Sequence, residues 1–200
     1  MTLILTDVDD VLVHWARGFI EHMGTTGFDT STAHMDFNHW INSNEHIRAE
    51  NLIDQFNDSE KFAELEPYDD AFDVVNRLHA QGYKFAAISA VEYSRESWAF
   101  RKQNLDKFFP DVFQSIFHVG LKQHSKKPML SAFAPTFWIE DNATNAADGA
   151  DLGHTSIILD RPYNRNIEHP KVLRVKSWYE IEQIITGNSQ ANSRPIHGYV

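Results

Sequence analysis

Short apolar segments alternate with segments of helical periodicity along most of the chain. The segments predicted as β-strands are Leu3–Thr6, Lys84–Ser89, Ser115–Val119, Thr136–Glu140, Thr155–Leu159 and Val172–Val175. The segments predicted as helices are Asp70–Ala80, Tyr93–Phe108, Pro128–Phe133, Ala143–Leu152 and Trp178–Ile185. Strands that alternate with helices favour an α/β fold, in which a parallel sheet is covered by helices on both faces. The continuously apolar runs Phe85–Ile88 and Phe137–Ile139 are typical of strands buried in such a sheet.

The interval from residue 16 to residue 67 interrupts this alternation. It is polar, has few strand-like runs and several aromatic residues, and shows a helical pattern over Asn44–Phe56. We therefore expect an α/β core formed by residues 1–15 and 68–186, with a small helical subdomain, residues 16–67, inserted after the first strand. Residues 187–200 are rich in Asn, Ser, Gly and Gln, and we expect them to form a poorly ordered tail.

Composition narrows the classes of function. The 200 residues suit one domain with a modest insertion, and the hydrophobic content of 42% is that of a folded globular protein. A formal net charge of −10 disfavours stable binding to nucleic-acid backbones or anionic membranes. The absence of cysteine excludes disulfides and thiolate chemistry. No signal peptide or membrane-spanning run is recognisable, so the expected location is the cytoplasm.

Polar side chains gather at the predicted carboxyl ends of the strands, where active sites form in parallel α/β sheets. They are Asp7 and Asp9 after the first strand, Ser89 at the end of the second, and Glu140 and Asp141 at the end of the fourth. Two carboxylates that converge on one point repel each other unless a cation or a shared proton lies between them. Taken singly, each feature also fits an acidic turn, a turn serine or a helix cap. Their joint occurrence favours a metal site suited to phosphate chemistry.

In this order, these residues resemble the four motifs of the haloacid dehalogenase (HAD) superfamily of phosphotransferases. The matching segments are Leu3–Asp9, Phe85–Ser89, Lys127 and Phe137–Asp141, and the resemblance covers roughly residues 2–186. It implies a Rossmann-like, HAD-like core, with the insertion after the first strand as a cap. Lys126 competes with Lys127 for the lysine motif, and we prefer Lys127 because Lys-Pro at a helix start is similar to the family pattern.

The resemblance implies hydrolysis of a phosphate ester in two steps, through an aspartyl-phosphate. Asp7 would be the nucleophile, and Asp9 would act first as general acid and then as general base. The hydroxyl of Ser89 and the ammonium of Lys127 would hold the phosphate oxygens.

The implied cofactor is Mg²⁺, a hard cation that prefers oxygen ligands. Its ligands would be the carboxylate of Asp7, the backbone carbonyl of Asp9, and Asp141, with Glu140 as an additional candidate. Asn145 occupies the position, four residues after Asp141, at which relatives commonly carry an acid. We expect Asn145 to support the site by hydrogen bonding rather than to bind the metal.

Two further segments are similar to those of 5′(3′)-deoxyribonucleotidases. They are Phe62–Pro67, which returns from the insertion to the core, and Leu159–Asn164. The resemblance implies a nucleoside monophosphate as substrate, and Trp15 lies where those enzymes carry an aromatic residue that stacks on the base. A place in the insertion's own core is an equally weighted alternative for Trp15, and the favoured one for Phe37 and Trp40.

Two other functions remain open from the sequence. One is hydrolysis of a different small phosphate ester, such as a sugar phosphate, and the other is a binding module that keeps the fold without catalysis. If the protein hydrolyses a nucleotide or another small phosphate ester, its expected partner is a small phosphorylated metabolite. We expect neither membrane association nor stable nucleic-acid binding. A homodimer is compatible with either hydrolytic activity.

Overall fold

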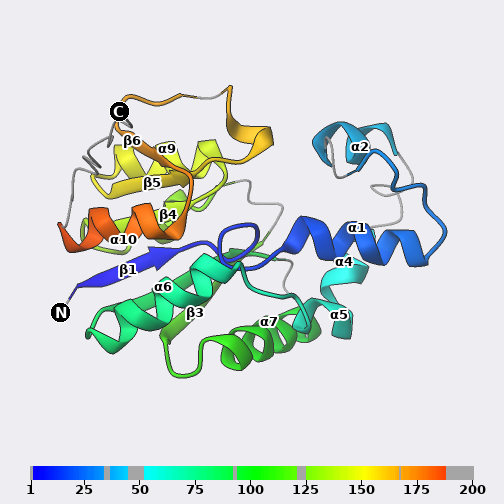
Figure 1. Ribbon diagram of the computed structural model, residues 1–200, viewed down its shortest axis with the longest axis horizontal. Helices are drawn as coiled ribbons and strands as arrows, with labels where there is room; N and C mark the ends of the chain where they lie inside the picture. The colour runs from blue at the N-terminus through cyan, green and yellow to red at the C-terminus, as the bar shows by residue number, and fades with distance from the viewer. Residues whose placement is uncertain are drawn as a thin grey trace, which may run out of the picture.

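The computed structural model contains one parallel sheet of six strands in the order β3-β2-β1-β4-β5-β6 (Figure 1). The structure describes residues 2–33, 37–44, 52–91, 94–120, 125–166 and 168–187. The strands are β1 Leu3–Thr6, β2 Lys84–Ala90, β3 Phe113–Val119, β4 Phe137–Glu140, β5 Thr155–Leu159 and β6 Val172–Val175. All pair in parallel and therefore end on the same edge of the sheet. The predicted α/β architecture is confirmed, and all six predicted strands are present.

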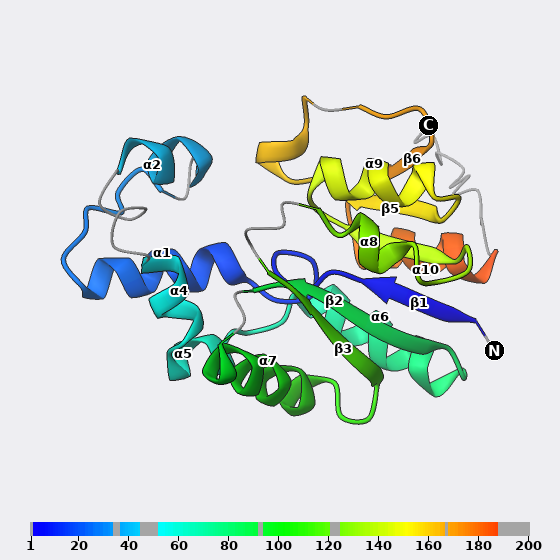
Figure 2. The same cartoon turned by 180° about the vertical axis from the view of Figure 1, so that it is seen from behind.

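Side chains along the central strands alternate between two hydrophobic layers. Ile4 and Ile139 belong to one layer, whereas Leu5 and Trp138 belong to the other. The first layer is covered by α6 Asp69–Ala80, α7 Arg95–Phe108 and α10 Trp178–Thr186, and the second by α8 Lys127–Leu130 and α9 Ala143–Asp151 (Figure 2). Burial on both faces explains why these strands are continuously apolar. No helix in the described part of the chain has the length and apolarity needed to cross a membrane.

Between β1 and α6 the described residues form four short helices. They are α1 Trp15–Thr25, α2 Phe37–Ser43, α4 Leu52–Asn57 and α5 Glu60–Ala63. Their aromatic rings pack together, as Phe19 and Phe56 do with centroids 5.5 Å apart, and they join the hydrophobic layer beneath α6. The predicted helix over Asn44–Phe56 overlaps α4, but residues 45–51 lie outside the described residues, as do residues 188–200 of the expected tail. That this insertion acts as a cap stays a prediction.

The order of the strands reverses between β1 and β4. From β1 the chain proceeds outward to β2 and β3, then crosses back to β4 and continues to β5 and β6 on the other side. In open α/β sheets, ligands bind beyond the carboxyl ends of the strands at such a point. The loops that follow β1 and β4 are therefore the ones that position a site.

Helix α9 approaches β4 very closely at Gly149. A Cβ atom at this position would lie 2.4 Å from Cδ1 of the buried Trp138. Because the buried indole cannot move aside easily, we expect Gly149→Ala to reduce the free energy of unfolding by about 1–3 kcal/mol, measured by denaturant unfolding. Gly24→Ala in α1 is the matched control. A Cβ atom at this position would have Thr30 Oγ1 as its nearest neighbour, at 3.5 Å, and alanine is a better helix former than glycine. Equal effects of the two substitutions would contradict this account of the packing.

Candidate active site

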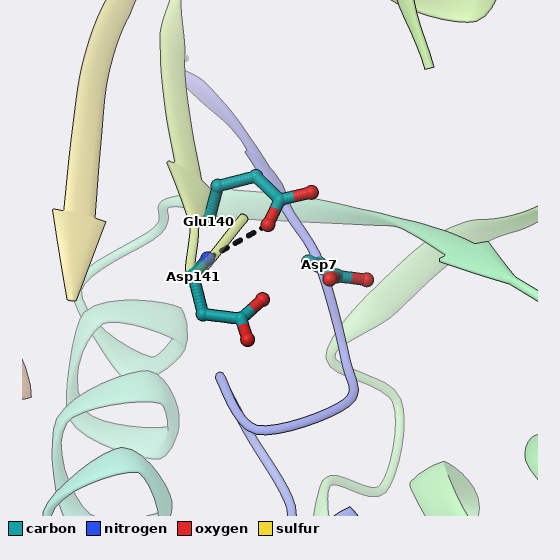
Figure 3. Close-up of side chains that lie close together, drawn as sticks. All are labelled: Asp7, Glu140 and Asp141. Atoms are coloured by element: carbon teal, nitrogen blue, oxygen red, sulfur yellow. Dashed lines mark hydrogen bonds between the residues drawn. The ribbon is translucent and has the colours of Figure 1, made fainter. Parts of the chain in front are cut away.

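Three buried carboxylates converge where β1 and β4 end (Figure 3). Asp7 follows β1, Glu140 is the last residue of β4, and Asp141 comes next. One carboxylate oxygen of each lies within 4.8 Å of the others, a spacing that could hold a metal ion. The strand ends thus bring together the acidic residues that the sequence indicated, apart from the Asp9 side chain.

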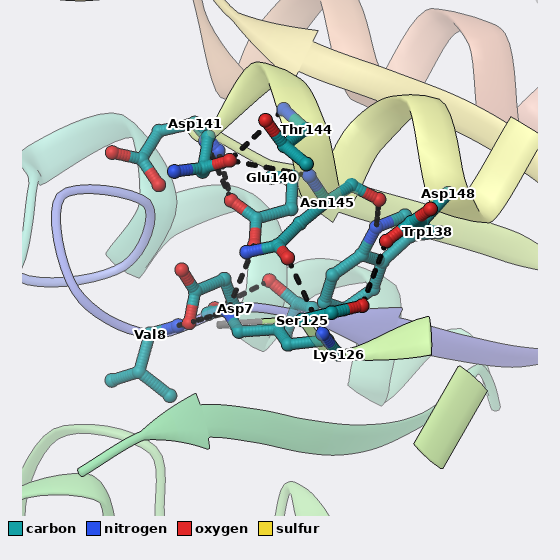
Figure 4. A network of polar contacts seen from close by, with 12 residues as sticks. Asp7, Val8, Ser125, Lys126, Trp138, Glu140, Asp141, Thr144, Asn145 and Asp148 are labelled. Atoms are coloured by element: carbon teal, nitrogen blue, oxygen red, sulfur yellow. Dashed lines mark hydrogen bonds and ion pairs between the residues drawn. The ribbon is translucent and has the colours of Figure 1, made fainter. Parts of the chain in front are cut away.

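A buried lysine neutralises part of this charge. The Nζ of Lys126 lies 2.6 Å from Asp7 Oδ1 and 2.8 Å from Glu140 Oε1, and its side chain is only 2% exposed (Figure 4). Its ammonium joins the carboxylates of two neighbouring strands. Lys126 is therefore the lysine that the fold brings to the carboxylates.

The preference for Lys127 over Lys126 as the lysine of the site is corrected, because Lys127 faces Asp148 and not the three carboxylates. Its Nζ lies 3.1 Å from Asp148 Oδ1 on α9, and its side chain is 47% exposed. Its backbone N–H donates to Ser125 Oγ, which itself donates to Asp148. The Lys-Pro pair does mark the start of α8, as expected. Consecutive residues around a helix start point in different directions, so only one of two adjacent lysines can face the site.

Glu140 has hydrogen bonds to both of its carboxylate oxygens. Oε1 accepts from Lys126 Nζ and from Asn145 Nδ2 at 2.9 Å, and Oε2 accepts from the backbone N–H groups of Asp141 and Asn142, both at 2.7 Å. Asn145 Oδ1 also accepts from the backbone N–H of Lys126 at 3.3 Å. The supporting hydrogen bonds expected of Asn145 are therefore present. With its oxygens engaged in this way, Glu140 is better suited to orienting Lys126 than to binding a metal.

The remaining two carboxylates are better suited to a cation. Both contacts of Asp7, from Lys126 and from the Val8 backbone N–H, fall on Oδ1. Asp141 Oδ2 accepts from the hydroxyl of Tyr163. The second oxygen of each carboxylate has no hydrogen bond within the described part of the chain. Oxygen donors in a buried, negatively charged cluster fit a hard divalent cation such as Mg²⁺.

The pKa shifts of the three carboxyl groups also favour a bound cation. Burial, with additional repulsion from Glu140 and Asp9, raises the pKa of Asp7 to about 7 although Lys126 opposes the shift. Burial and the charges of Glu140 and Asp7 raise the pKa of Asp141 well above its ordinary value. For Glu140, burial acts in the same direction but is outweighed by Lys126 and the hydrogen bonds, so its pKa is lowered. A bound divalent cation would offset the excess negative charge.

The raised pKa of Asp7 predicts a pH dependence of stability without metal. Because the folded protein holds this proton more tightly (pKa about 7, against 3.8 ordinarily), its contribution is full below pH 3.8 and is lost as pH rises through about 7. Asn at this position does not titrate. In chelator-treated protein between pH 5 and pH 8, we expect the wild type to lose about 1–3 kcal/mol relative to Asp7→Asn. Thermal or denaturant unfolding measures this difference; parallel pH curves for the two proteins would contradict the prediction.

The Asp9 side chain faces a different partner. Its Oδ1 accepts from Nη2 of Arg101, a fully buried residue of α7. The sequence alone does not single out Arg101, because an arginine in a helical pattern ordinarily lies on a solvated face. The one available signal was its spacing from Leu105, four residues on, which places the two on one side of α7.

Ser89 lies near the end of β2 and is fully buried. Its hydroxyl has no hydrogen-bond partner among the residues that the structure describes. A buried hydroxyl without a partner is costly unless water or a ligand satisfies it. An unsatisfied hydroxyl at this strand end is compatible with a ligand contact, and a role of Ser89 in holding a phosphate oxygen stays a prediction.

Asp10 is a turn residue. It adopts a positive φ of 53°, a conformation that aspartate tolerates better than most side chains. Its carboxylate accepts from the backbone N–H of Ala16 in α1, and its backbone carbonyl accepts from the guanidinium of Arg161, at 2.8 Å from Nη2. Burial raises its pKa to about 7. Asp10 thus fastens the start of the insertion to the loop after β5.

The segment after β5 supports Asp141. In addition to the contact from Tyr163, the side chain of Asn164 donates to the backbone carbonyl of Asp141 at 2.7 Å. A cavity of about 340 Å³ adjoins this carboxylate. It is lined by Asp10, Phe37, Asp141, Asn142, Ala143, Thr144, Tyr163 and Asn164. The insertion therefore contributes Phe37 to a cavity beside the carboxylates.

Trp15 does not line that cavity. Its ring stacks on Phe19 with centroids 5.1 Å apart, and its Nε1 donates to Asn57 Oδ1 at 2.9 Å. Phe37, for which a place in the insertion's core is favoured, does pack against that core, edge-on to Trp15, and it also lines the cavity. A direct contact of Trp15 with a base stays a prediction.

Comparisons with known proteins agree with this fold. Among solved structures, L-2-haloacid dehalogenase from Xanthobacter autotrophicus, with chloropropionic acid covalently bound, is similar with a TM-score of 0.63 and 10% identity, covering 94% of this chain and 99% of that one. A HAD family hydrolase from Deinococcus radiodurans R1, with bound phosphate and sodium, has a TM-score of 0.60 and 16% identity, covering 93% and 95%. These structures show a HAD-like fold.

Two sequence comparisons extend the likeness. A protein of Enterobacteria phage T4, described as an uncharacterized 32.4 kDa protein in the Gp30-rIII intergenic region, is 26% identical over 194 residues, covering 90% of this chain and 68% of that protein. A family model described as 5′ nucleotidase, deoxy (Pyrimidine), cytosolic type C protein matches residues 1–191. The chain therefore belongs to the 5′ nucleotidase, deoxy (pyrimidine), cytosolic type C family.

Proposed function

We propose that this protein is a Mg²⁺-dependent phosphomonoester hydrolase that acts on (deoxy)ribonucleoside 5′-monophosphates through an aspartyl-phosphate. The observation that carries the proposal is the position of Asp7, buried at the end of β1 against Lys126 and within 4.8 Å of Asp141. A carboxylate, an ammonium and a second carboxylate at one point are the groups that phosphoryl transfer requires: a nucleophile, a phosphate-binding cation and a metal ligand.

The first step transfers the phosphoryl group to the protein. An oxygen of Asp7 forms a bond to phosphorus, the ester P–O bond breaks, and Asp9 gives a proton to the leaving alcohol. The ammonium of Lys126 and the hydroxyl of Ser89 hold the phosphate oxygens while charge redistributes. In the second step water attacks phosphorus, its proton goes to Asp9, and Asp7 is released.

Mg²⁺, when bound by Asp7, Asp141 and the Asp9 backbone carbonyl, would supply the positive charge that lets an anionic nucleophile approach a phosphate dianion. Glu140 and Asn145 would hold Lys126 in position, and Tyr163 and Asn164 would orient Asp141. Such supporting hydrogen bonds commonly fix the direction in which metal ligands point.

The cavity beside Asp141 supports a small substrate. Its volume of about 340 Å³ is at the lower end of ordinary ligand pockets. The Phe37 ring on one side offers an apolar surface for a base or a sugar, and Asn142, Thr144 and Tyr163 offer polar groups. The family of the chain favours a nucleotide over other phosphate esters.

A substrate panel tests the proposal. Phosphate release is measured from purine and pyrimidine nucleoside 5′-monophosphates, their deoxy forms and several sugar phosphates, each with Mg²⁺ and with chelator. We expect Mg²⁺-dependent release from nucleotides at higher kcat/KM than from sugar phosphates. Turnover of sugar phosphates alone would show that the substrates are sugar phosphates and not nucleotides. No phosphate release from any ester would overturn the proposal.

A further inference from the structure

A buried arginine of α7 pairs with Asp9. Arg101 is 0% exposed, and its Nη2 donates to Asp9 Oδ1. Its guanidinium also lies over the ring of Phe62 in α5, with Cζ 4.1 Å from the ring centroid. Helices α5 and α7 lie side by side in both Figure 1 and Figure 2. Withdrawing a guanidinium from water is costly unless its charge and its donors are matched, so this burial needs an explanation.

Packing alone does not explain why an arginine is buried at position 101. Its Nε and Nη1 have no hydrogen-bond partner among the described residues. Burial, together with the charge of Arg101, lowers the pKa of His118 to about 4, so that imidazole is neutral and adds no second positive charge beside Arg101. Within the described part of the chain, Asp9 is the carboxylate that pairs with Arg101. Since an apolar side chain of similar volume would fill the same space at lower cost, what arginine supplies here is its charge, which pairs with Asp9 and lies over the Phe62 ring.

Arg101 holds Asp9 against a firmly attached helix. One turn further along α7, Asn104 Nδ2 donates to the backbone carbonyls of Ala63 at 3.2 Å and Leu65 at 2.7 Å. These bonds fasten α7 to the segment that returns from the insertion. Asp9 itself lies in the loop after β1, and its side chain is 21% exposed. Without Arg101 its carboxylate would be free to turn toward solvent.

We propose that Arg101 is a positioning residue that keeps the Asp9 carboxyl group in the orientation from which it serves the leaving-group oxygen. This inference rests on the function proposed above. When the Asp7–phosphorus bond forms and the ester P–O bond breaks, the leaving oxygen takes its proton from Asp9. When water then attacks phosphorus, Asp9 recovers a proton and the cycle closes. Arg101 touches neither substrate nor phosphorus and acts only through Asp9.

The dependence of the rate on the leaving group tests this role. An alkyl phosphate, here a nucleoside 5′-monophosphate, needs a proton on its leaving oxygen, whereas p-nitrophenyl phosphate releases a stable phenolate without one. The value of kcat/KM reports the step in which the leaving group departs. We expect Arg101→Gln to lower kcat/KM for the nucleotide about 10–100-fold more than for p-nitrophenyl phosphate. Loss of structure alone would lower both equally.

Four further variants complete the test. Arg95→Gln, on the exposed side of the same helix, should leave both rates unchanged. Asp9→Asn should show the same leaving-group signature, and adding Arg101→Gln to it should change the ratio of the two rates no further. Arg101→Lys keeps the positive charge but lacks the planar guanidinium, so its ratio of kcat/KM for the two esters should lie between those of the wild type and Arg101→Gln. If Arg101→Gln does not fold, Arg101→Lys tests the positioning role in its place.

The outcomes separate the two proposals. Wild-type hydrolysis with an unchanged ratio in the Arg101 variants overturns the positioning role and leaves the proposed function standing. An additive effect of Arg101→Gln in the Asp9→Asn background also overturns it. A wild type that hydrolyses neither ester overturns the proposed function and this inference with it.

Discussion

Asp7→Asn is expected to reduce phosphomonoester hydrolysis by about 10⁴-fold or more, because the amide cannot attack phosphorus to form the acyl-phosphate. The fold should survive the change. Asp7 is one of three crowded carboxylates, and its removal leaves Lys126 paired with Glu140 at 2.8 Å. Steady-state phosphate release with Mg²⁺, and thermal unfolding of the same samples, measure the two quantities.

The matched control for this substitution is Asp106→Asn. Asp106 is an exposed residue of α7 whose carboxylate pairs with Lys102 on the protein surface. It is expected to retain wild-type activity. Substantial hydrolysis by a folded Asp7→Asn protein would remove Asp7 from the role of nucleophile, whatever the other residues do.

The second large loss of stability and activity is expected when Lys126 is substituted, and not when Lys127 is. Lys126→Met leaves Asp7 and Glu140 buried without their shared cation. Removing one partner of a buried ion pair costs about 3–5 kcal/mol of stability, and losing a charge that contacts the transferred group lowers kcat by about 10²–10³-fold. Unfolding in the presence of chelator and turnover with Mg²⁺ measure the two effects.

Lys127→Met is the control that the chain itself supplies. The Lys127 side chain is 47% exposed, and a pair with a solvent-exposed partner of this kind contributes at most about 1 kcal/mol. Activity should stay near that of the wild type. Lys126→Arg keeps the charge and should fold even if Lys126→Met does not. Greater loss of activity in Lys127→Met than in either Lys126 variant would contradict the geometry.

The fold was largely predictable because the strand signal is local. Buried parallel strands require continuous apolar runs, and Phe85–Ile88 and Phe137–Ile139 are such runs. The order of polar residues at their ends then fixed which side chains meet, since parallel strands end on one edge. Asp7, Glu140 and Asp141 were found in this way.

The rest depended on tertiary contacts that no local pattern carries. Lys126 and Lys127 are chemically identical, and only the direction in which the chain enters α8 decides which one faces Asp7. Arg101 is buried because Asp9 and Phe62 meet it from elsewhere in the chain. The insertion was expected as helical, but its division into short helices and the position of Phe37 at the cavity follow from aromatic packing rather than periodicity.

Trapping of the phosphorylated protein tests the central claim most directly. The protein is mixed with a deoxyribonucleoside 5′-monophosphate and Mg²⁺, quenched in acid within one turnover and digested for mass spectrometry. The account predicts one added phosphoryl group on the peptide that contains Asp7, sensitive to hydroxylamine as an acyl-phosphate is, and absent from Asp7→Asn. Turnover of the nucleotide with no phosphorylated peptide at any quench time, or with the label on another residue, would contradict it.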